Sequence, residues 1–423
     1  MNESNLYLQR YGFQKSLFSS EPRPDLGIVV VIPCFNEREL ITSLDSLAAC
    51  DDTRCALEIL VIINDSDHSS RQVREQNQQT FEEVRRWINC KTTDKRQFLV
   101  HYESRIPDKQ SGVGTARKIG MDEAVRRLEK ANKGNGIIVS FDADSVCDRN
   151  YLRAIEGHFL ENSKCTGASI YFEHPFEGPL PKDHYTGVIF YELFLRYYIN
   201  ALRYAAFPHA YQTVGSSMAV RSAIYQKQGG MNKRKAGEDF YFLHKIIPLG
   251  DYGEINSTRV IPSARVSDRV PFGTGKAIQA WLDGHHKHYF TYHPNIFKDL
   301  KIFLSEVDQL FRARPSDIDK CLEKWPESIT VFLCDNDFKT HLKEINRYCG
   351  PTREAFLSRF YSWFNGFKVL KYAHFARDRY YLNMEIEKAV QWLLSVYPGI
   401  EKPPASAMEQ LVEIRKRDRN GWP

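Results

Sequence analysis

Two aspartates separated by a single alanine close the stretch IVSFDADS, residues 138–145. The apolar run before them predicts a buried strand, so Asp142 and Asp144 would stand where that strand ends. Paired carboxylate oxygens in such a place suit a hard divalent cation, either Mg²⁺ or Mn²⁺. A solvated turn, or the start of a helix before RNYLRAIEGHFL, would use the same residues. The pair alone does not decide between these interpretations.

A second acidic pair, Glu238 and Asp239, follows Gly237 in the stretch AGEDFYFLHKI. Carboxylates in the first turn of a helix interact favourably with the helix dipole, which is one explanation for the pair. A carboxylate beside an attacking hydroxyl can also accept its proton, which is the other explanation. The two explanations are compatible.

Strand patterns alternate with helical patterns, such as residues 37–49 and 70–88, through the first 145 residues. The apolar runs that predict strands lie at residues 28–32, 57–63, 98–102 and 136–141. This alternation predicts a doubly wound, mainly parallel α/β sheet. Ligands bind such sheets at the carboxyl ends of the strands, and the loops there are expected to share one crevice. These loops are residues 34–37, 64–70, 111–117 and 142–145.

Four segments, taken in order, resemble the family 2 glycosyltransferases, which are inverting enzymes of the GT-A fold. The segments are VVVIPCFNE (29–37), EILVIINDS (58–66), IIVSFDADS (137–145) and AGEDFYFLHKI (236–246). The resemblance covers about residues 27–260. It implies a GT-A-type, Rossmann-like α/β fold, with a mainly parallel sheet flanked by helices.

The resemblance also implies a role for each acidic pair. Asp144 would hold a Mn²⁺ or Mg²⁺ ion, with Asp142 near the ribose or the metal. Asp239 would be the general base, with Glu238 orienting the acceptor or a neighbouring segment of the chain. Negative charge builds up on phosphate oxygens as a nucleoside diphosphate leaves, and a cation held there neutralises it. The acceptor hydroxyl loses its proton as it attacks, which requires the base. We therefore expect inverting transfer of a sugar from a nucleotide sugar to a hydroxyl.

The nucleotide is expected against the loops that follow the first two strands. The first of these loops includes Pro33, Phe35 and Glu37. Family members commonly end the second strand in paired aspartates, whereas this chain has Asn64 and Asp65. Asn64 offers both a donor and an acceptor to a pyrimidine edge, which favours a UDP-sugar. The departure from the family pattern leaves the identity of the base open.

Two further segments are candidates for phosphate contacts. Gly112, Gly114 and Arg117 resemble the family's loop beside the nucleotide, although an ordinary helix start with a surface arginine would use the same residues. Arg265 and Arg269 stand four residues apart ahead of two glycines and could bind the diphosphate through their forked guanidinium groups. Solvated arginines on a surface turn are the alternative.

A histidine cluster and an aromatic stripe also have two explanations each. His285, in the cluster HHKH (285–288), is a candidate for a further metal ligand, because some GT-A enzymes use a C-terminal histidine in this way. Histidines of this kind are more often surface or packing residues. Tyr191, Phe194 and Tyr198 share a helical stripe, for which core packing is the default and an acceptor platform the alternative.

Apolar spacing changes to a purely helical pattern from about residue 300. We therefore expect a helical C-terminal domain. The predicted divisions are an N-terminal arm (1–26), a nucleotide-sugar-binding half (27–145), an acceptor-binding half (146–295) and the helical domain (296–423).

Composition limits the classes of protein to which this chain can belong. The chain has 423 residues, of which 42% are hydrophobic, enough for a large core. A net charge of +5 is mild at this length and does not indicate a nucleic-acid partner. Nine cysteines without a CxxC pair favour a reducing cytoplasm. No run approaches the roughly 18 apolar residues of a membrane span, while the basic, aromatic segment 368–381 leaves open peripheral contact with the inner face of a membrane.

Two other functions compete with glycosyl transfer. A nucleotidyltransferase of similar fold is disfavoured, because its Gly-rich, basic signature is absent after the first strand, where the chain reads PCFNE. A catalytically silent nucleotide-binding scaffold is the weaker alternative, since Asp142, Asp144 and Asp239 are all present. The acceptor, whether a glycan, a lipid-linked molecule or a small molecule, depends on pocket contacts that a sequence does not display.

Overall fold

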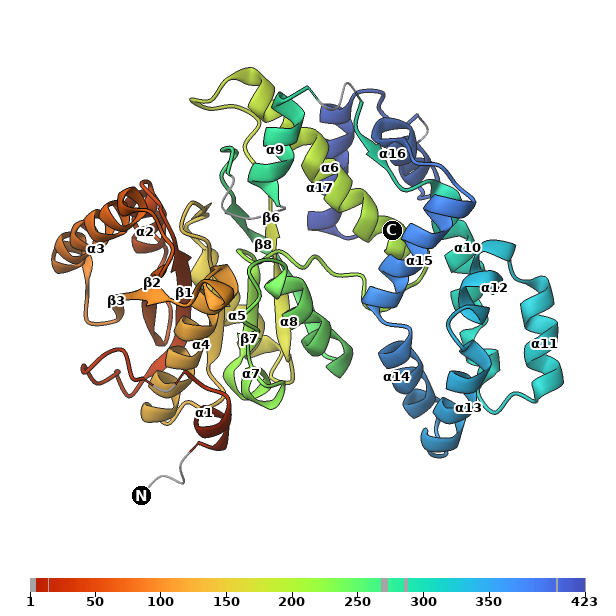
Figure 1. Cartoon of the computed structure of the whole chain (residues 1–423), viewed down its shortest axis with the longest axis horizontal. Helices are drawn as coiled ribbons and strands as arrows, with labels where there is room; N and C mark the ends of the chain where they lie inside the picture. Colours follow the sequence, from red (N-terminus) through yellow and green to blue (C-terminus); the bar gives the residue numbers. More distant parts are fainter. Residues whose placement is uncertain (1–4, 14, 268–272, 285–287, 401, 423) are drawn as a thin grey trace. The chain divides into compact units, whose positions relative to one another are not determined.

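The computed structural model describes residues 5–13, 15–267, 273–284, 288–400 and 402–422 (Figure 1). The chain groups into two compact units. Unit 1 contains Met1–Leu180 and Thr213–Lys276, and unit 2 contains Pro181–Gln212 and Ala277–Pro423. Unit 1 holds both acidic pairs, and the segment between them that forms a long helix belongs to unit 2.

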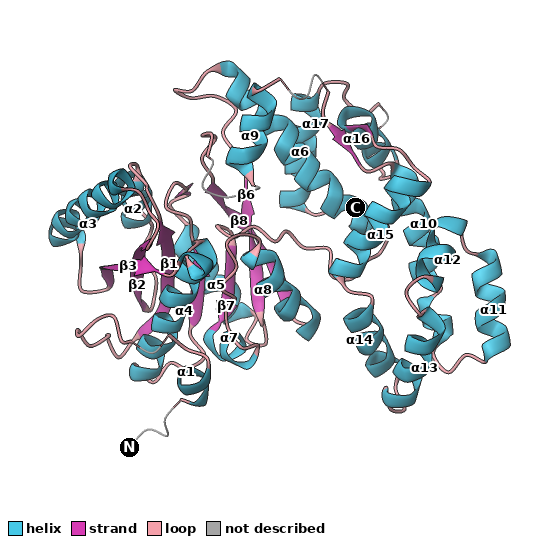
Figure 2. Ribbon diagram, viewed as in Figure 1, coloured by secondary structure: helices cyan, strands magenta, loops and turns pink. Residues whose placement is uncertain are grey.

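Unit 1 is built on an eight-stranded sheet in the order β3-β2-β1-β4-β7-β6-β8-β5 (Figure 2). The strands are β1 (Leu26–Cys34), β2 (Ala56–Ser66), β3 (Arg96–Ile106), β4 (Ile137–Ser140), β5 (Val146–Cys147), β6 (Gly167–Phe172), β7 (Met218–Arg221) and β8 (Tyr252–Ile261). The first four in this order are mutually parallel, β7 runs antiparallel to both its neighbours, and β6 and β8 are again parallel. The predicted mainly parallel α/β sheet flanked by helices is confirmed.

Helices cover the sheet of unit 1. They are α1 (Leu6–Arg10), α2 (Leu40–Ala48), α3 (Arg71–Lys91), α4 (Val113–Lys130), α5 (Tyr151–Glu161), α7 (Ser222–Lys227) and α8 (Glu238–Ile246), and α9 (Thr274–Leu282) spans the boundary between the units. Helix α4 packs on β1 and β2, and α3 packs on β2 and β3. A Cβ atom at Gly120 of α4 would lie 2.4 Å from Val31, so the missing side chain lets the helix approach the sheet. Strand β2 is buried along its whole length, which explains its almost unbroken apolar sequence.

The first residues of the chain are fixed to α4 through one buried carboxylate, Asp122. The hydroxyl groups of Tyr7 and Tyr225 donate to it at 2.6 and 2.7 Å, and the backbone N–H of Phe13 donates at 2.8 Å. Lys118 forms an ion pair with it at 3.0 Å. Because a buried carboxylate is costly without such partners, the arm is an integral part of unit 1.

Unit 2 is helical apart from two short strands in the part of it that the structure describes. Its elements are α6 (Lys182–Tyr204), β9 (Phe290–Thr291), α10 (Pro294–Ser305), α11 (Pro315–Lys324), α12 (Glu327–Cys334), α13 (Phe338–Tyr348), α14 (Arg353–Trp363), α15 (Gly366–Arg379), β10 (Met384–Glu385), α16 (Ile386–Ser395) and α17 (Ala407–Asn420). Buried ion pairs join α6 to α17: Glu192 binds Arg415 at 2.6 Å, and Arg196 binds Asp418 at 2.5 Å.

The aromatic stripe of α6 packs within unit 2. The ring of Tyr198 lies 5.7 Å from that of Tyr292 and 6.2 Å from that of Phe297. Phe194 lies 6.0 Å from Tyr289. These contacts are those of a core. None of the described helices is both long and apolar enough to cross a lipid bilayer.

Candidate active site

The segment with Asp142 and Asp144 leaves the sheet at the carboxyl end of β4. The backbone N–H of Phe141 still donates to the carbonyl of Val31 in β1, at 3.1 Å, so the chain stays beside β1 for one more residue. Phe141 and Ala143 are buried, whereas the side chains of Asp142 and Asp144 keep 37% and 25% of their surface exposed. Both carboxylates are therefore partly exposed, whereas the residues before each of them are in the core.

Arg117, in the first turns of α4, joins the two acidic pairs. Its Nε donates to the hydroxyl of Ser140 at 2.9 Å, and its Nη2 donates to Asp142 at 2.5 Å. Its Nη1 donates to the carboxylate of Glu238. Only 3% of the Arg117 side chain is exposed. One buried guanidinium thus contacts the end of β4 and the start of α8, which holds the two motifs in a single site.

The second acidic pair begins α8. Gly237 precedes it with φ of +69°, a left-handed conformation that favours glycine. Glu238 is buried on Arg117, while Asp239 is half-buried and accepts a hydrogen bond from the backbone N–H of Phe240 at 2.7 Å. Burial raises the pKa of Asp239 above its usual value, the positive charge of Arg117 opposes this shift, and the negative charge of Asp142 adds to it. A raised pKa suits a carboxylate that must accept a proton.

Arg265, in the segment after β8, contacts the other member of the first pair. Its guanidinium lies 2.8 Å from Glu37, 3.3 Å from Glu39 and 3.5 Å from Asp144. The predicted residues Glu37, Asp144 and Arg265 are therefore brought together from three separate segments. The other predicted arginine of this segment, Arg269, and the candidate ligand His285 lie outside the described residues.

The end of β2 has a different arrangement from the one expected for a nucleotide contact. Asp65 is buried, and its two oxygens accept hydrogen bonds from the hydroxyl of Tyr102 and, at 2.7 Å, from the backbone N–H of Arg105. The carbonyl of the adjacent Asn64 accepts a hydrogen bond from Asn77 at 3.1 Å. Asp65 therefore ties the end of β2 to the end of β3.

The remaining predicted residues shape the backbone around these groups. Pro33 lies in β1, and Phe35 follows this strand. Gly112 caps α4 with φ of +152°. A Cβ atom at Gly114 would lie 2.4 Å from the carbonyl oxygen of Arg234, so the glycine lets the chain before α8 lie on the start of α4. The role of Gly114 is thus close backbone approach.

The donor set of this site fits a hard divalent cation whose coordination is completed by phosphate oxygens. Asp142 and Asp144 supply carboxylate oxygens only, the ligand type that Mg²⁺ and Mn²⁺ prefer, and Mg²⁺ commonly takes one or two carboxylates plus substrate phosphates. Within the described ranges there is no group of three His, Cys, Asp or Glu side chains placed to hold a metal ion by themselves.

Sequence reasoning missed several residues of the site. Ser140 contacts Arg117, and Glu39 contacts Arg265. Tyr102 and Asn77 donate hydrogen bonds to the end of β2. The three consecutive basic residues in the stretch NKRKAGED were a visible signal of a charged surface beside the second acidic pair.

Comparison with known proteins supplies the family. Residues 29–226 match the model of glycosyl transferase family 2. The chain resembles the crystal structure of S. aureus TarS 1–349 in complex with UDP-GlcNAc at a TM-score of 0.38 and 14% identity, over 80% of this chain and 91% of that one. It resembles S. aureus TarS at a TM-score of 0.37 and 16% identity, over 75% and 55% of the two chains. No curated protein sequence matches. Residues 29–226 therefore match a glycosyl transferase family 2 domain, which indicates that the chain is a glycosyltransferase.

Proposed function

We propose that this glycosyltransferase moves a sugar from a UDP-sugar to an acceptor hydroxyl, with inversion at the anomeric carbon and the help of Mg²⁺ or Mn²⁺. The observation that carries the proposal is the placement of Arg117, which contacts both Asp142 and Glu238. The carboxylates that we propose hold the metal ion and the carboxylate that we propose as the base are far apart in sequence. Arg117 thereby brings their two segments together in one site. Single displacement with inversion needs groups of this kind on both sides of the sugar.

The donor side of the proposed site is Asp142, Asp144 and Arg265. A cation on the two aspartates would supply positive charge to the leaving diphosphate. Arg265, which already lies 3.5 Å from Asp144, would donate hydrogen bonds to the same phosphate oxygens. Charge that develops on the leaving group is thus met by positive groups held in place before the reaction.

The acceptor side of the proposed site is α8. Asp239 accepts the proton of the attacking hydroxyl, and its raised pKa strengthens it as a base. Glu238, fixed on Arg117, positions the first turn of α8 and with it Asp239. For the nucleotide, we propose that Asn64 meets the pyrimidine edge, because both oxygens of the adjacent Asp65 already accept hydrogen bonds from the chain itself.

Calorimetry with UDP, GDP and dTDP, each with and without Mn²⁺, tests the proposal. We expect UDP to bind most tightly and only with the metal, and the substitution Asp144→Ala to abolish this binding. The control Asp52→Ala removes a carboxylate that is 91% exposed and should leave binding unchanged. Binding of no nucleotide by the wild-type protein would contradict the donor assignment, and metal-independent binding would remove the cation from it.

A further inference from the structure

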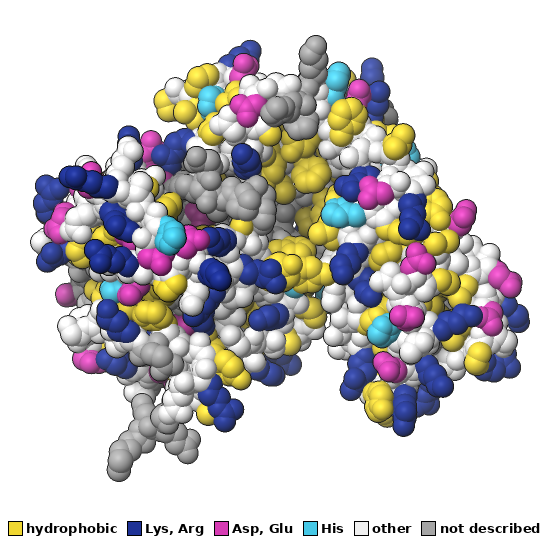
Figure 3. Space-filling view, in the orientation of Figure 1, with side chains coloured by type: hydrophobic (Ala, Val, Ile, Leu, Met, Phe, Trp, Pro, Cys, Tyr) yellow, Lys and Arg dark blue, Asp and Glu magenta, His cyan; other side chains and the backbone are white. Residues whose placement is uncertain are grey.

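Three consecutive cations, Lys233-Arg234-Lys235, lie two residues before the second acidic pair, and we call this segment the basic loop. All three residues are exposed. Figure 3 shows Lys and Arg side chains gathered on the face of unit 1 that carries α4 and α8. Three positive charges within a few residues of the proposed base create a local positive potential where the acceptor must arrive.

Contacts on both sides fix the basic loop in place. The guanidinium of Arg234 lies 3.6 Å from the centre of the Tyr241 ring in α8. Lys235 pairs with Asp108 at 2.9 Å. Of the carboxylates in the described ranges, Asp108 alone comes within 4.0 Å of a side-chain nitrogen of the loop. Most of the loop's charge is therefore not neutralised by the protein, and Arg234 is held against the helix that carries Asp239.

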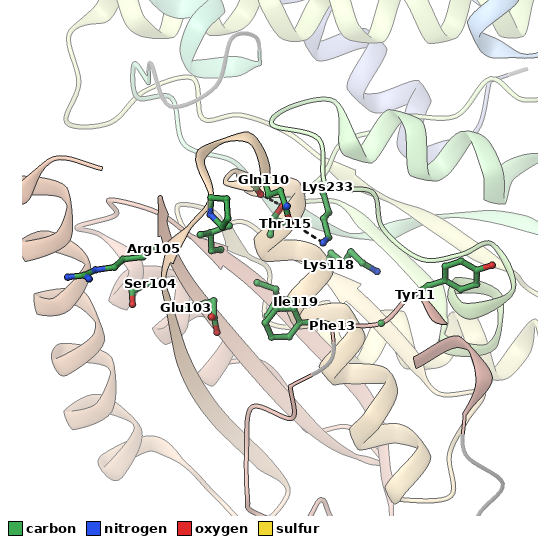
Figure 4. A pocket seen from close by; sticks show the side chains of 13 residues that line it. Tyr11, Phe13, Glu103, Ser104, Arg105, Gln110, Thr115, Lys118, Ile119 and Lys233 are labelled. Carbon is green, nitrogen blue, oxygen red and sulfur yellow. Dashed lines mark hydrogen bonds between the residues drawn. The ribbon is translucent and has the colours of Figure 1, made fainter. Parts of the chain in front are cut away.

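The basic loop borders a cavity of about 220 Å³ in unit 1. Figure 4 shows Lys233, Gln110 and Thr115 at one end of this cavity and Phe13 and Ile119 at the other, and Lys233 donates a hydrogen bond to Gln110 at 3.4 Å. Besides Lys233, the cation Arg105 and the carboxylate Glu103 line it, and Lys118, which also lines it, is paired with Asp122. The cations Lys233 and Arg105, together with the apolar side chains of Phe13 and Ile119, suit a small ring or a short polyol that carries a negative charge.

We propose that the basic loop and this cavity bind an anionic acceptor, a glycan or polyol that carries phosphate or carboxylate groups near its accepting hydroxyl. The inference rests on the proposed function. The group that Asp239 deprotonates belongs to the acceptor, and Arg234 packs on Tyr241, two residues further along the same helix, so an anion on the loop would lie within reach of the same molecule. The diphosphate of the donor is assigned to other residues, Asp144 and Arg265.

The concave form of this surface favours a soluble anionic chain over a membrane. Segments that dock on bilayers present large apolar side chains beside their cations, and these enter the acyl region. The basic loop instead contains no large apolar residue, and its immediate neighbours are Asn232 and Ala236. The ring of Tyr241 packs against the guanidinium of Arg234.

Binding to three glycans with one backbone tests this inference without any donor turnover. The probes are dextran, carboxymethyl dextran and phosphorylated dextran, immobilised for biolayer interferometry at low and at high salt. We expect the wild-type protein to bind the two anionic dextrans and not dextran itself, with weaker binding at high salt. The triple variant Lys233→Gln, Arg234→Gln, Lys235→Gln should bind the anionic dextrans about tenfold or more weakly.

Two matched variants separate the loop from bulk charge and from folding. The triple variant Arg71→Gln, Arg85→Gln, Arg86→Gln removes the same charge from the exposed face of α3 and should bind like the wild type. Lys233→Arg with Lys235→Arg keeps the charge of the loop and should also bind normally.

Three results would overturn the inference. They are equal binding of neutral and anionic dextran, an equal loss in both glutamine variants, and binding to vesicles that contain anionic phospholipid without binding to any dextran. The last result would assign the loop to a membrane surface instead. Because no nucleotide is present, the outcome is independent of whether the protein uses UDP.

Discussion

Asp239 is the proposed general base of the site. Its carboxylate must be ionised to accept a proton, and burial raises its pKa. Acidification should therefore abolish activity at a higher pH than it would for an aspartate with the usual pKa. The pH profile of kcat/KM for transfer or for donor hydrolysis measures this limb. An acid limb at the usual aspartate pKa would mean that another group is the base.

Removal of this carboxylate separates catalysis from binding. We expect Asp239→Asn to lower the transfer rate by about 10²–10⁴-fold, the typical contribution of a general base, while UDP still binds with its metal.

The same substitution should also change how the free energy of unfolding depends on pH. A folded-state pKa above the unfolded value means that ionisation disfavours folding, so the variant should gain stability over the wild type as the pH rises through the raised pKa. Urea unfolding at several pH values measures this difference.

Arg117 shows what a sequence pattern does not disclose about a residue. Its position after a glycine-rich turn is equally typical of a surface arginine, and the burial of its guanidinium depends on Asp142 and Glu238, which reach it only in the folded chain. Asp65 is a second case, because its partners Tyr102 and Arg105 lie on a neighbouring strand. The sequence indicated that these polar residues belong to the candidate site. It did not indicate which groups they contact, since those partners are set by the tertiary structure.

Substitution of Arg117 should therefore affect stability as well as activity. Arg117→Met leaves two carboxylates without their common buried partner, and we expect a loss of about 3–5 kcal/mol in the free energy of unfolding. The control Arg71→Met breaks an exposed ion pair with Glu75 and should change stability by less than about 0.5 kcal/mol. Urea denaturation measures both. Equal stability of the two variants would show that Arg117 does not hold the site together.

At the scale of elements, the strands that carry the site follow directly from their sequence. The apolar runs at 28–32 and 57–63 became β1 and β2, because strands buried on both faces need unbroken apolar residues. The runs at 98–102 and 136–141 became β3 and β4. The order in which β5 to β8 extend the sheet was not predictable from such runs, since β5 has only two residues and β7 only four.

The contact between α4 and the chain before α8 can be tested with a single methyl group. A Cβ atom at Gly114 would lie 2.4 Å from a backbone oxygen, so Gly114→Ala should lower stability by about 1–3 kcal/mol and reduce transfer as α8 shifts. In contrast, Gly157 in α5 has open space around its missing side chain. Gly157→Ala should stabilise the protein by about 0.5–1 kcal/mol, because alanine favours a helix more than glycine does. Thermal unfolding and transfer assays measure both effects.

At the scale of the whole molecule, the two units have separate networks of buried charge. In unit 2, Glu192 is shared by Arg196 and Arg415. We expect Arg415→Ala to leave this network short of one positive charge and to destabilise unit 2 by about 3 kcal/mol or more. Calorimetry should then show a lowered transition for unit 2 and an unchanged one for unit 1. A parallel decrease of a single transition would show that the units unfold together.

The hydrogen bonds to Asp122 decide where the smallest fragment able to fold alone can begin. The region that matches the family model starts at residue 29, yet Tyr7 and Phe13 both serve this buried carboxylate in α4. A fragment trimmed to the family match would keep Lys118 and Tyr225 but remove two of the four partners of this buried carboxylate, which lies five residues from Arg117 in the same helix. Expression of the catalytic half therefore needs the opening residues as much as it needs the aspartates.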